Sequence, residues 1–329
     1  KDLVLSTQGR SFWILDDLSP LHSSLGQHLE EPVLYDIKDS YRTNVSNSNP
    51  VFNFYLPKLD TAIIYQIQIF DPKQEVVLTY SSKPDKDKGE RKFKFKKGHN
   101  KLSWNLRYPG PVLVADMVSM VISPNTPGPM AVPGDYQLKL STGVWNDSKP
   151  FKVKSDPRWV NVSIADYEAQ FNMAMEMKAM IEESHQVIKN MRAIRNQVTL
   201  IADLGKKAGY SEAVGEAVTK LDKELTAIED KVIQNKAKSS QDAINYPRVF
   251  SNHIGRLYGV LNNAQDKPTG GVLERYEDLK IEYRTITDGY QNLIDLVMPA
   301  FNNLLEQESV GRLIVPYAIK SNVVLPKKN

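Results

Sequence analysis

The first half of the chain alternates apolar and polar side chains, a pattern typical of half-buried β-strands. In 92–96 the alternation is strict, which predicts Phe93 and Phe95 inside and the intervening lysines in solvent. About seven such strands, separated by turn residues, predict an immunoglobulin-like or fibronectin-like β-sandwich over residues 33–157. The clearest strand segments are 63–70, 76–80, 92–96, 101–107 and 136–140.

Beyond Asp156-Pro157-Arg158 the apolar positions recur every three or four residues, which indicates amphipathic helices. The first stripe starts near Ser163 or Asp166 and continues to Gly205 and Gly209. Short loops between helices predict antiparallel neighbours in a helical bundle of about four helices over residues 158–310. Residues 311–329 form a C-terminal tail. The other stripes fall in 214–232, 247–261 and 271–304.

Residues 1–32 contain an isolated hairpin pattern. Two short apolar runs, 3–7 and 12–15, flank the turn residues Gln8-Gly9-Arg10. A lone hairpin is unstable in water, so these apolar side chains need a sheet to join. We therefore predict the terminal strands of a truncated upstream domain. A catalytic pair of Asp16 and Asp17 is disfavoured, since neighbouring strand positions point to opposite faces.

Composition narrows the function classes. The 329 residues hold 42 Lys and Arg against 39 Asp and Glu, a net charge of +3 that does not favour nucleic acid as a partner. Cysteine is absent, which excludes disulfides, thiolate catalysis and cysteine-bound metals. Only five histidines occur, and no apolar run is long enough to span a bilayer. We expect no transmembrane segment.

A lysine-rich stretch from Lys83 to Lys101 carries nine basic and three acidic residues. One interpretation is a polyanion or lipid-headgroup contact through its central lysines. The favoured interpretation is a solvated hairpin, whose lysines alternate with core phenylalanines and discourage pairing at the sheet edge. The candidate polyanion contacts are Lys92, Lys94, Lys96 and Lys97.

The sequence contains no complete motif for catalysis or for cofactor binding. Glu182 lies three residues before His185, as in di-iron carboxylate proteins, but a second such pair is missing, because Phe250 stands three residues before His253. Neither a Gly-x-Ser-x-Gly elbow nor a phosphate-binding or dinucleotide-binding glycine motif occurs. We therefore assign no catalytic, metal-binding or cofactor-binding residue and predict no cofactor.

A long excursion rich in proline and glycine runs from Tyr108 to Pro133, and a loop of this length is often functional or packed on a neighbouring domain. Large aromatic residues near the domain ends could seal a junction or stack on a ligand, and sealing is favoured. The candidate interdomain contacts are Trp13, Tyr108, Trp145 and Trp159.

Several short motifs follow one another in a specific order. They are 5–17, 41–44, Trp104-Asn105-Leu106-Arg107-Tyr108-Pro109-Gly110-Pro111, 131–136, Asp156-Pro157-Arg158, 167–171 and Pro299-Ala300-Phe301-Asn302. This order resembles the C-terminal third of large secreted bacterial β-propeller proteins, the sortilin-type or BNR-repeat family often labelled glycosyl hydrolase. The resemblance implies a remnant propeller hairpin, an immunoglobulin-like domain and a helical bundle. It also implies export to the periplasm, outer membrane or exterior of a Gram-negative bacterium.

The hydrolase label of that family rests on propeller repeats with a Ser-x-Asp-x-Gly-x-x-Trp box, which this chain lacks. The leading hypothesis is a non-catalytic scaffold that packs on the propeller, in the same protein or in a processed partner chain, and presents a partner-binding surface at the cell envelope. The alternative is an accessory part of a glycan- or peptide-processing hydrolase, with the long loop reaching an active site on the propeller. A binder of anionic surface polymers ranks third.

Overall fold

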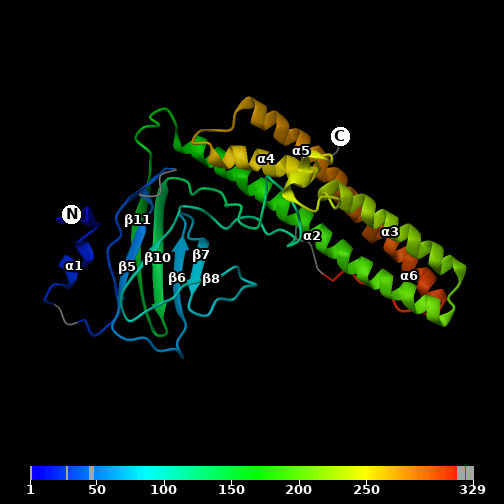
Figure 1. The fold of residues 1–329 in the computed structure, drawn as a ribbon, viewed down its shortest axis with the longest axis horizontal. Helices are drawn as coiled ribbons and strands as arrows, with labels where there is room; N and C mark the ends of the chain where they lie inside the picture. The colour runs from blue at the N-terminus through cyan, green and yellow to red at the C-terminus, as the bar shows by residue number, and fades with distance from the viewer. Residues whose placement is uncertain (1, 27–28, 44–47, 317–322, 324–329) are drawn as a thin grey trace. The chain divides into compact units, whose positions relative to one another are not determined.

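The computed structural model describes residues 2–26, 29–43, 48–316 and 323. The chain forms two compact units, one of Lys1–Pro109 with Met130–Ile164 and one of Gly110–Pro129 with Ala165–Asn329. The first contains the strands and the second the long helices (Figure 1), so the protein is a mixed β and α chain in the expected order. The excursion at 110–129, which sequence placed among the strands, clusters with the helices.

The strand unit has three sheets among its described residues. A six-stranded sheet has the order β4-β11-β10-β6-β7-β8, a three-stranded sheet has the order β3-β5-β9, and β1 pairs only with β2. Most pairings are antiparallel, and β4 and β8 join the edges of the large sheet in parallel. The strands are β1 Leu3–Ser6, β2 Phe12–Leu15, β3 Val33–Leu34, β4 Ser40–Arg42, β5 Val51–Leu56, β6 Tyr65–Phe70, β7 Val76–Ser81, β8 Arg91–Lys92, β9 Gly98–Ser103, β10 Gly134–Thr142 and β11 Trp145–Ser155, with the short helix α1 Ser19–Ser24 after β2.

The six-stranded and three-stranded sheets bury a shared core. Alternate residues of β5, β6 and β10 point inward, and Trp104 is fully buried between them with its indole nitrogen donating to the Arg107 carbonyl at 3.0 Å. The predicted strand at 92–96 is shorter than expected, because only Arg91–Lys92 pairs with β7. The side chains nevertheless alternate as predicted, with Phe95 buried and the lysines exposed.

The helical unit is built on one long helix, α2 Ile164–Ala208. It ends where Gly209 adopts a φ of +72°, a left-handed conformation that glycine accepts without strain. The backbone amides of Gly209 and Tyr210 both donate to the Gly205 carbonyl, which satisfies the last turn. The later helices are α3 Glu212–Val232, the 3-10 turn η2 Ser240–Ile244, α4 Phe250–Asn263, α5 Gly270–Asn292, the π-helical turn η3 Leu293–Val297 and α6 Met298–Gln307.

Side-chain hydrogen bonds give the direction of each helix relative to α2. Arg192 and Arg195 bind Glu229 and Asp222 respectively, so α3 runs antiparallel to the C-terminal half of α2. Gln170 binds the end of α4, so α4 runs antiparallel to the N-terminal half. Both helices therefore run antiparallel to α2, α4 along its N-terminal half and α3 along its C-terminal half, as Figure 1 shows.

Residues 110–129 are a structural part of the helical unit. Val114 and Ile122 are buried in its core, and the Asn262 side-chain amide donates to the carbonyls of Pro127 and Gly128 at 3.1 and 3.0 Å. The Val114 amide donates to the buried ring of His185 at 3.1 Å. This irregular segment is thus held through its backbone by polar side chains of α2 and α4.

Candidate functional site

The β1–β2 hairpin exposes apolar side chains on both of its faces. The register pairs Leu3 with Leu15 and Leu5 with Trp13 on one face, and Val4 with Ile14 on the other. Every residue of the two strands is exposed, Trp13 to 62%. Strands that are apolar on both faces are typical of sheets covered on both sides. Neither strand pairs with a third strand in the described part of the chain.

Polar contacts fix the chain that follows the hairpin. The Asp17 amide donates to the Asp2 carboxylate at 3.0 Å, and the Asp17 carboxylate forms an ion pair with Lys38 at 2.7 Å. Partial burial alone would raise the pKa of Asp17, but the hydrogen bonds from Lys38 and Ser19 outweigh it and lower this pKa. Asp17 therefore serves as a structural anchor, and the described residues show no hydrogen bond between its side chain and that of Asp16.

A groove in the strand unit gathers lysines over an aromatic lining. It has a volume of about 270 Å³, and Tyr65 and Phe93 contribute to its wall. Lys83, Lys92 and Lys94 also line it. Of the four predicted polyanion contacts, Lys92 and Lys94 thus lie at the groove, while Lys96 and Lys97 are exposed outside its lining.

The groove lysines differ in their partners. The Lys92 ammonium donates to the Ser82 carbonyl, which holds it at the rim. Lys83 and Lys94 are exposed and make no ion pair with any residue that the structure describes. The lining also holds one carboxylate, that of Asp60, which accepts from the Ala62 amide at 2.8 Å. Lys83 belongs to the lysine-rich stretch that the sequence indicated but not to the four candidate contacts, because strand alternation does not show which lysines line one groove.

The four aromatic residues predicted at interdomain contacts have different surroundings. Tyr108 and Trp145 pack against the core of the strand unit, and the Tyr108 hydroxyl donates to Asp71 at 3.3 Å. Burial strongly raises the pKa of Tyr108 above its ordinary value. Trp13 and Trp159 are exposed, the latter to 47%. An interdomain role for the four residues stays a prediction.

Glu182 and His185 of α2 both contact the backbone of the 110–129 segment, whereas Glu183 contacts Tyr283 of α5. Glu182 accepts from the Val112 amide at 3.0 Å and binds Lys178 at 2.8 Å, whereas the buried Glu183 accepts the hydroxyl of Tyr283. His185 binds the Val114 amide through Nδ1 and lies 3.4 Å from the Ser251 hydroxyl through Nε2. Within the described residues no group of three or more His, Asp and Glu side chains could hold a metal ion.

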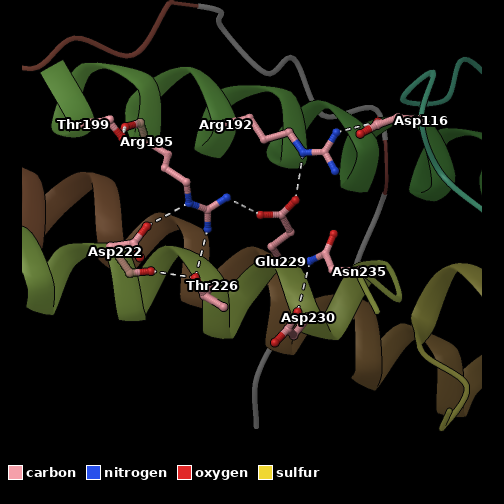
Figure 2. A network of polar contacts seen from close by, with 9 residues as sticks. All are labelled: Asp116, Arg192, Arg195, Thr199, Asp222, Thr226, Glu229, Asp230 and Asn235. Carbon is pink, nitrogen blue, oxygen red and sulfur yellow. Dashed lines mark hydrogen bonds and ion pairs between the residues drawn. The ribbon is translucent and has the colours of Figure 1, made fainter. Parts of the chain in front are cut away.

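A charged network ties α2, α3 and the 110–129 segment together (Figure 2). Glu229 of α3 is 4% exposed and accepts from Arg192 at 2.8 Å and from Arg195 at 2.6 Å. Arg192 also binds Asp116 at 2.6 Å, and Arg195 also binds Asp222 at 2.9 Å. Two cations thus flank one buried carboxylate, and each of its oxygens is paired with one arginine.

Searches against known proteins leave the family open. No family model and no curated protein matches this chain. Among solved structures, the crystal structure of CopC from Methylosinus trichosporium OB3b is similar over 38% of this chain and 95% of that chain, at 14% identity and a TM-score of 0.20. A likeness at that score carries no argument about fold or function. No described helix is both long enough and apolar enough to cross a membrane.

Proposed function

We propose that this chain is a non-catalytic interaction module of an exported β-propeller protein, which packs on the propeller through the β1–β2 hairpin and presents a partner-binding surface at the cell envelope. The observation that carries the proposal is the exposure of apolar side chains on both hairpin faces. Water is an unfavourable environment for so many apolar groups, so a partner must cover them.

A β-propeller supplies the environment that the hairpin requires. Each blade of a propeller is a small antiparallel sheet, and blades are arranged around a central channel so that their faces pack on one another. A hairpin added to such a blade would gain a neighbouring strand and lose the exposure of Trp13 and Ile14 together. An immunoglobulin-like sandwich and a helical bundle would follow it, in keeping with the family resemblance.

Hydrogen exchange provides the test. In the polypeptide isolated from its native source, the amides of Leu3–Ser6 and Phe12–Leu15 should be strongly protected, and cross-linking should place the hairpin beside a β-rich domain. In the 329-residue chain alone the same amides should exchange within seconds to minutes, as expected for a marginal hairpin. Rapid exchange of these amides in the native polypeptide would rule out the docking role.

A double substitution provides the matched variant. Trp13→Asp with Ile14→Asp places one charge on each hairpin face and should abolish docking, without changing the thermal unfolding of the remainder of the chain. Arg10→Asp in the turn between the strands is the control, because it adds an acid without touching either face. Equal docking of both variants would contradict the proposal.

The alternative remains an accessory part of a glycan- or peptide-processing hydrolase whose active site lies on the propeller. Assays of the full-length protein and of a variant with Val112→Asp and Met120→Asp, two exposed positions of the 110–129 segment, separate the two. Loss of turnover in this variant, with the helical unit still folded, would favour the accessory role. Unchanged turnover, or no turnover in either form, would favour the interaction module.

One observation favours a second function, binding of an anionic polymer. Two lysines without acidic partners among the described residues, Lys83 and Lys94, face the same aromatic groove. A carboxylated sugar polymer would place its charges near these lysines and its ring carbons over the apolar lining. This function is compatible with the docking role, because the groove and the hairpin involve different strands.

A further inference from the structure

A groove between α3 and α6 is lined almost entirely by apolar side chains. The two helices lie side by side in the helical unit (Figure 1), and the groove between them has a volume of about 320 Å³. Leu221 and Phe301 of its lining are buried, whereas Leu296 is 64% exposed. Small-molecule sites typically have volumes of roughly 300 to 1,000 Å³. The α3–α6 groove lies at the lower end of this range, so its size suits one slender ligand.

Two features of the sequence leave this space unfilled. Ala217 of α3 and Ala300 of α6 contribute only methyl groups to the lining. Just before α6 the helix widens into the π-helical turn η3, where the Met298 amide donates to the Leu293 carbonyl five residues earlier. Pro299 follows and has no amide hydrogen, so the regular α-helical bonds cannot continue through it. The widened turn itself lines the groove, and π-helical turns are frequent at functional sites.

Lys220 of α3 is the one charged residue that lines the groove in the part of the chain that the structure describes. Its side chain is exposed and makes no hydrogen bond or ion pair with any described residue. Glu216 and Glu224 stand one helical turn away on the same helix, but neither carboxylate pairs with it. The groove therefore combines an apolar lining with a single positive charge that is available to a ligand.

This combination selects among classes of ligand. A peptide would bury N–H and C=O groups where the lining offers no polar side chain except Lys220, and such burial is costly. A two-fold contact between copies of the chain would bring two Lys220 side chains into one interface, which is unfavourable. An alkyl chain needs no hydrogen bond in the groove, and a carboxylate at its end matches the one lysine. The lining thus fits a single-chain carboxylate better than a protein segment.

We propose that the α3–α6 groove binds a free fatty acid of medium chain length, with its alkyl chain against Leu221 and Phe301 and its carboxylate beside Lys220. Burial of the alkyl chain supplies the affinity, because each methylene group removed from water contributes to it. The carboxylate sets the orientation of the ligand through its attraction to the lysine. The proposal is independent of the docking role of the hairpin, since the groove belongs to the helical unit.

Calorimetric titration of the 329-residue chain with dodecanoate, below its micelle concentration, tests the proposal. Saturable binding is expected, and Lys220→Glu should weaken it by about tenfold, because attraction to the carboxylate becomes repulsion. Lys231→Glu is the matched control, since this exposed lysine of α3 lies outside the lining and its replacement should leave the affinity unchanged. Dodecanol carries no charge, so its affinity should be the same for the unmodified chain and both variants.

A bulky substitution tests the position of the alkyl chain. Ala300→Trp places an indole at an exposed position of the lining and should abolish binding of dodecanoate and of dodecanol. Asn303→Trp adds the same bulk at an exposed position of α6 outside the lining and should not. Thermal unfolding of both variants should match that of the unmodified chain. If Ala300→Trp does not fold, the comparison of Lys220→Glu with Lys231→Glu decides alone.

Three results would overturn the proposal. The first is absence of dodecanoate binding by the unmodified chain. The second is equal binding within either matched pair of variants, which would place the ligand elsewhere. The third is binding of phosphatidylglycerol vesicles without binding of dodecanoate, which would make the groove a membrane contact.

Discussion

Tyr283 of α5 donates its hydroxyl to the buried carboxylate of Glu183, which lies one hundred positions earlier on α2. The same offset recurs one heptad before and one heptad after this pair. The Tyr276 hydroxyl binds Glu176 at 2.5 Å, and the Asn190 amide binds the Tyr290 hydroxyl at 2.7 Å. A constant offset requires two parallel helices in a seven-residue register, and three tyrosines therefore fix how α5 lies along α2.

Of these three hydrogen bonds, the one between Tyr283 and Glu183 should contribute most to stability. Tyr283→Phe leaves the buried Glu183 with one donor fewer and should lower the free energy of unfolding by about 2 kcal/mol. Tyr276→Phe is the matched control, because Glu176 is exposed and water replaces the lost hydroxyl, so its cost should stay below about 1 kcal/mol. Urea unfolding of the two variants measures the difference. Equal losses would show that burial of Glu183 does not determine the cost.

Acid should weaken the hold of α2 on the 110–129 segment. Nδ1 of His185 accepts from the Val114 amide, so the neutral ring carries its hydrogen on Nε2. Burial, followed by the charges of Lys189 and Arg192, lowers the pKa of His185 to about 4. The unfolded chain takes up this proton below about pH 6.5, whereas the folded chain does so only below about pH 4. Stability is therefore complete above pH 6.5 and falls as the pH is lowered toward 4.

The size of this effect follows from the shift in pKa. A decrease of roughly 3 kcal/mol in the free energy of unfolding is expected between pH 7 and pH 4 from this group. His185→Asn retains an acceptor for the Val114 amide but does not titrate, so its unfolding curve should lose this part of the pH dependence. Chemical unfolding at several pH values gives the comparison. Parallel pH profiles of the two proteins would refute the assignment.

The buried carboxylate of Figure 2 should be far more sensitive than the acids around it. Glu229→Gln leaves two arginines facing a neutral group, and should cost about 3 kcal/mol of stability. Asp222→Asn removes an ion pair of Arg195 whose carboxylate is half-exposed, and should change stability by less than about 1 kcal/mol. Thermal unfolding at matched pH measures both variants. A larger loss from Asp222→Asn would contradict the ranking.

Two glycines of α4 offer a test of how closely the 110–129 segment packs. A Cβ at Gly255 would lie 3.0 Å from the Ile122 Cβ, whereas a Cβ at Gly259 meets nothing within 4 Å. Gly259→Ala should raise stability by about 1 kcal/mol through helix propensity. The free energy of unfolding of Gly255→Ala should be lower than that of Gly259→Ala by at least about 1 kcal/mol, because Ile122 must shift. Equal stability of the two variants would mean that the 110–129 segment moves to accept the new methyl group without loss of stability.

The lysine groove predicts position-dependent binding of a carboxylated polysaccharide such as alginate. Lys83→Glu with Lys94→Glu should reduce the affinity at low salt by about tenfold, since both charges face the groove. Lys96→Glu with Lys97→Glu changes the net charge equally outside the groove and should have the smaller effect. Equal losses would indicate a diffuse charge effect. Absence of binding at about 20 mM salt would exclude this function.

The sequence predicted what depends on local periodicity. Phe95 is buried between exposed lysines because successive side chains of 92–96 point to opposite sides, even though little of that segment pairs as a strand. The three tyrosines of α5 belong to the apolar stripe that sequence identified. Their partners on α2 could not be predicted, because the offset between two helices depends on the turns between them and on core packing. The length of the Tyr108–Pro133 excursion predicted that it is functional or packs on a neighbouring domain. The choice between the two could not be predicted, because the contacts of residues 110–129 come from Asn262 and His185, which are distant in sequence.

The interleaving of the two units has a consequence for proteolysis and for gene rearrangement. The chain passes from one unit to the other after residues 109, 129 and 164. Each fragment left by a single cleavage therefore lacks part of at least one unit, and after a nick within 110–129 both fragments contribute to both. The pairing of β6 with β10 would hold such a nicked molecule together. A single recombination breakpoint after residue 109 or after residue 164 would likewise transfer one complete unit only together with a segment of the other, so no single breakpoint separates the two units.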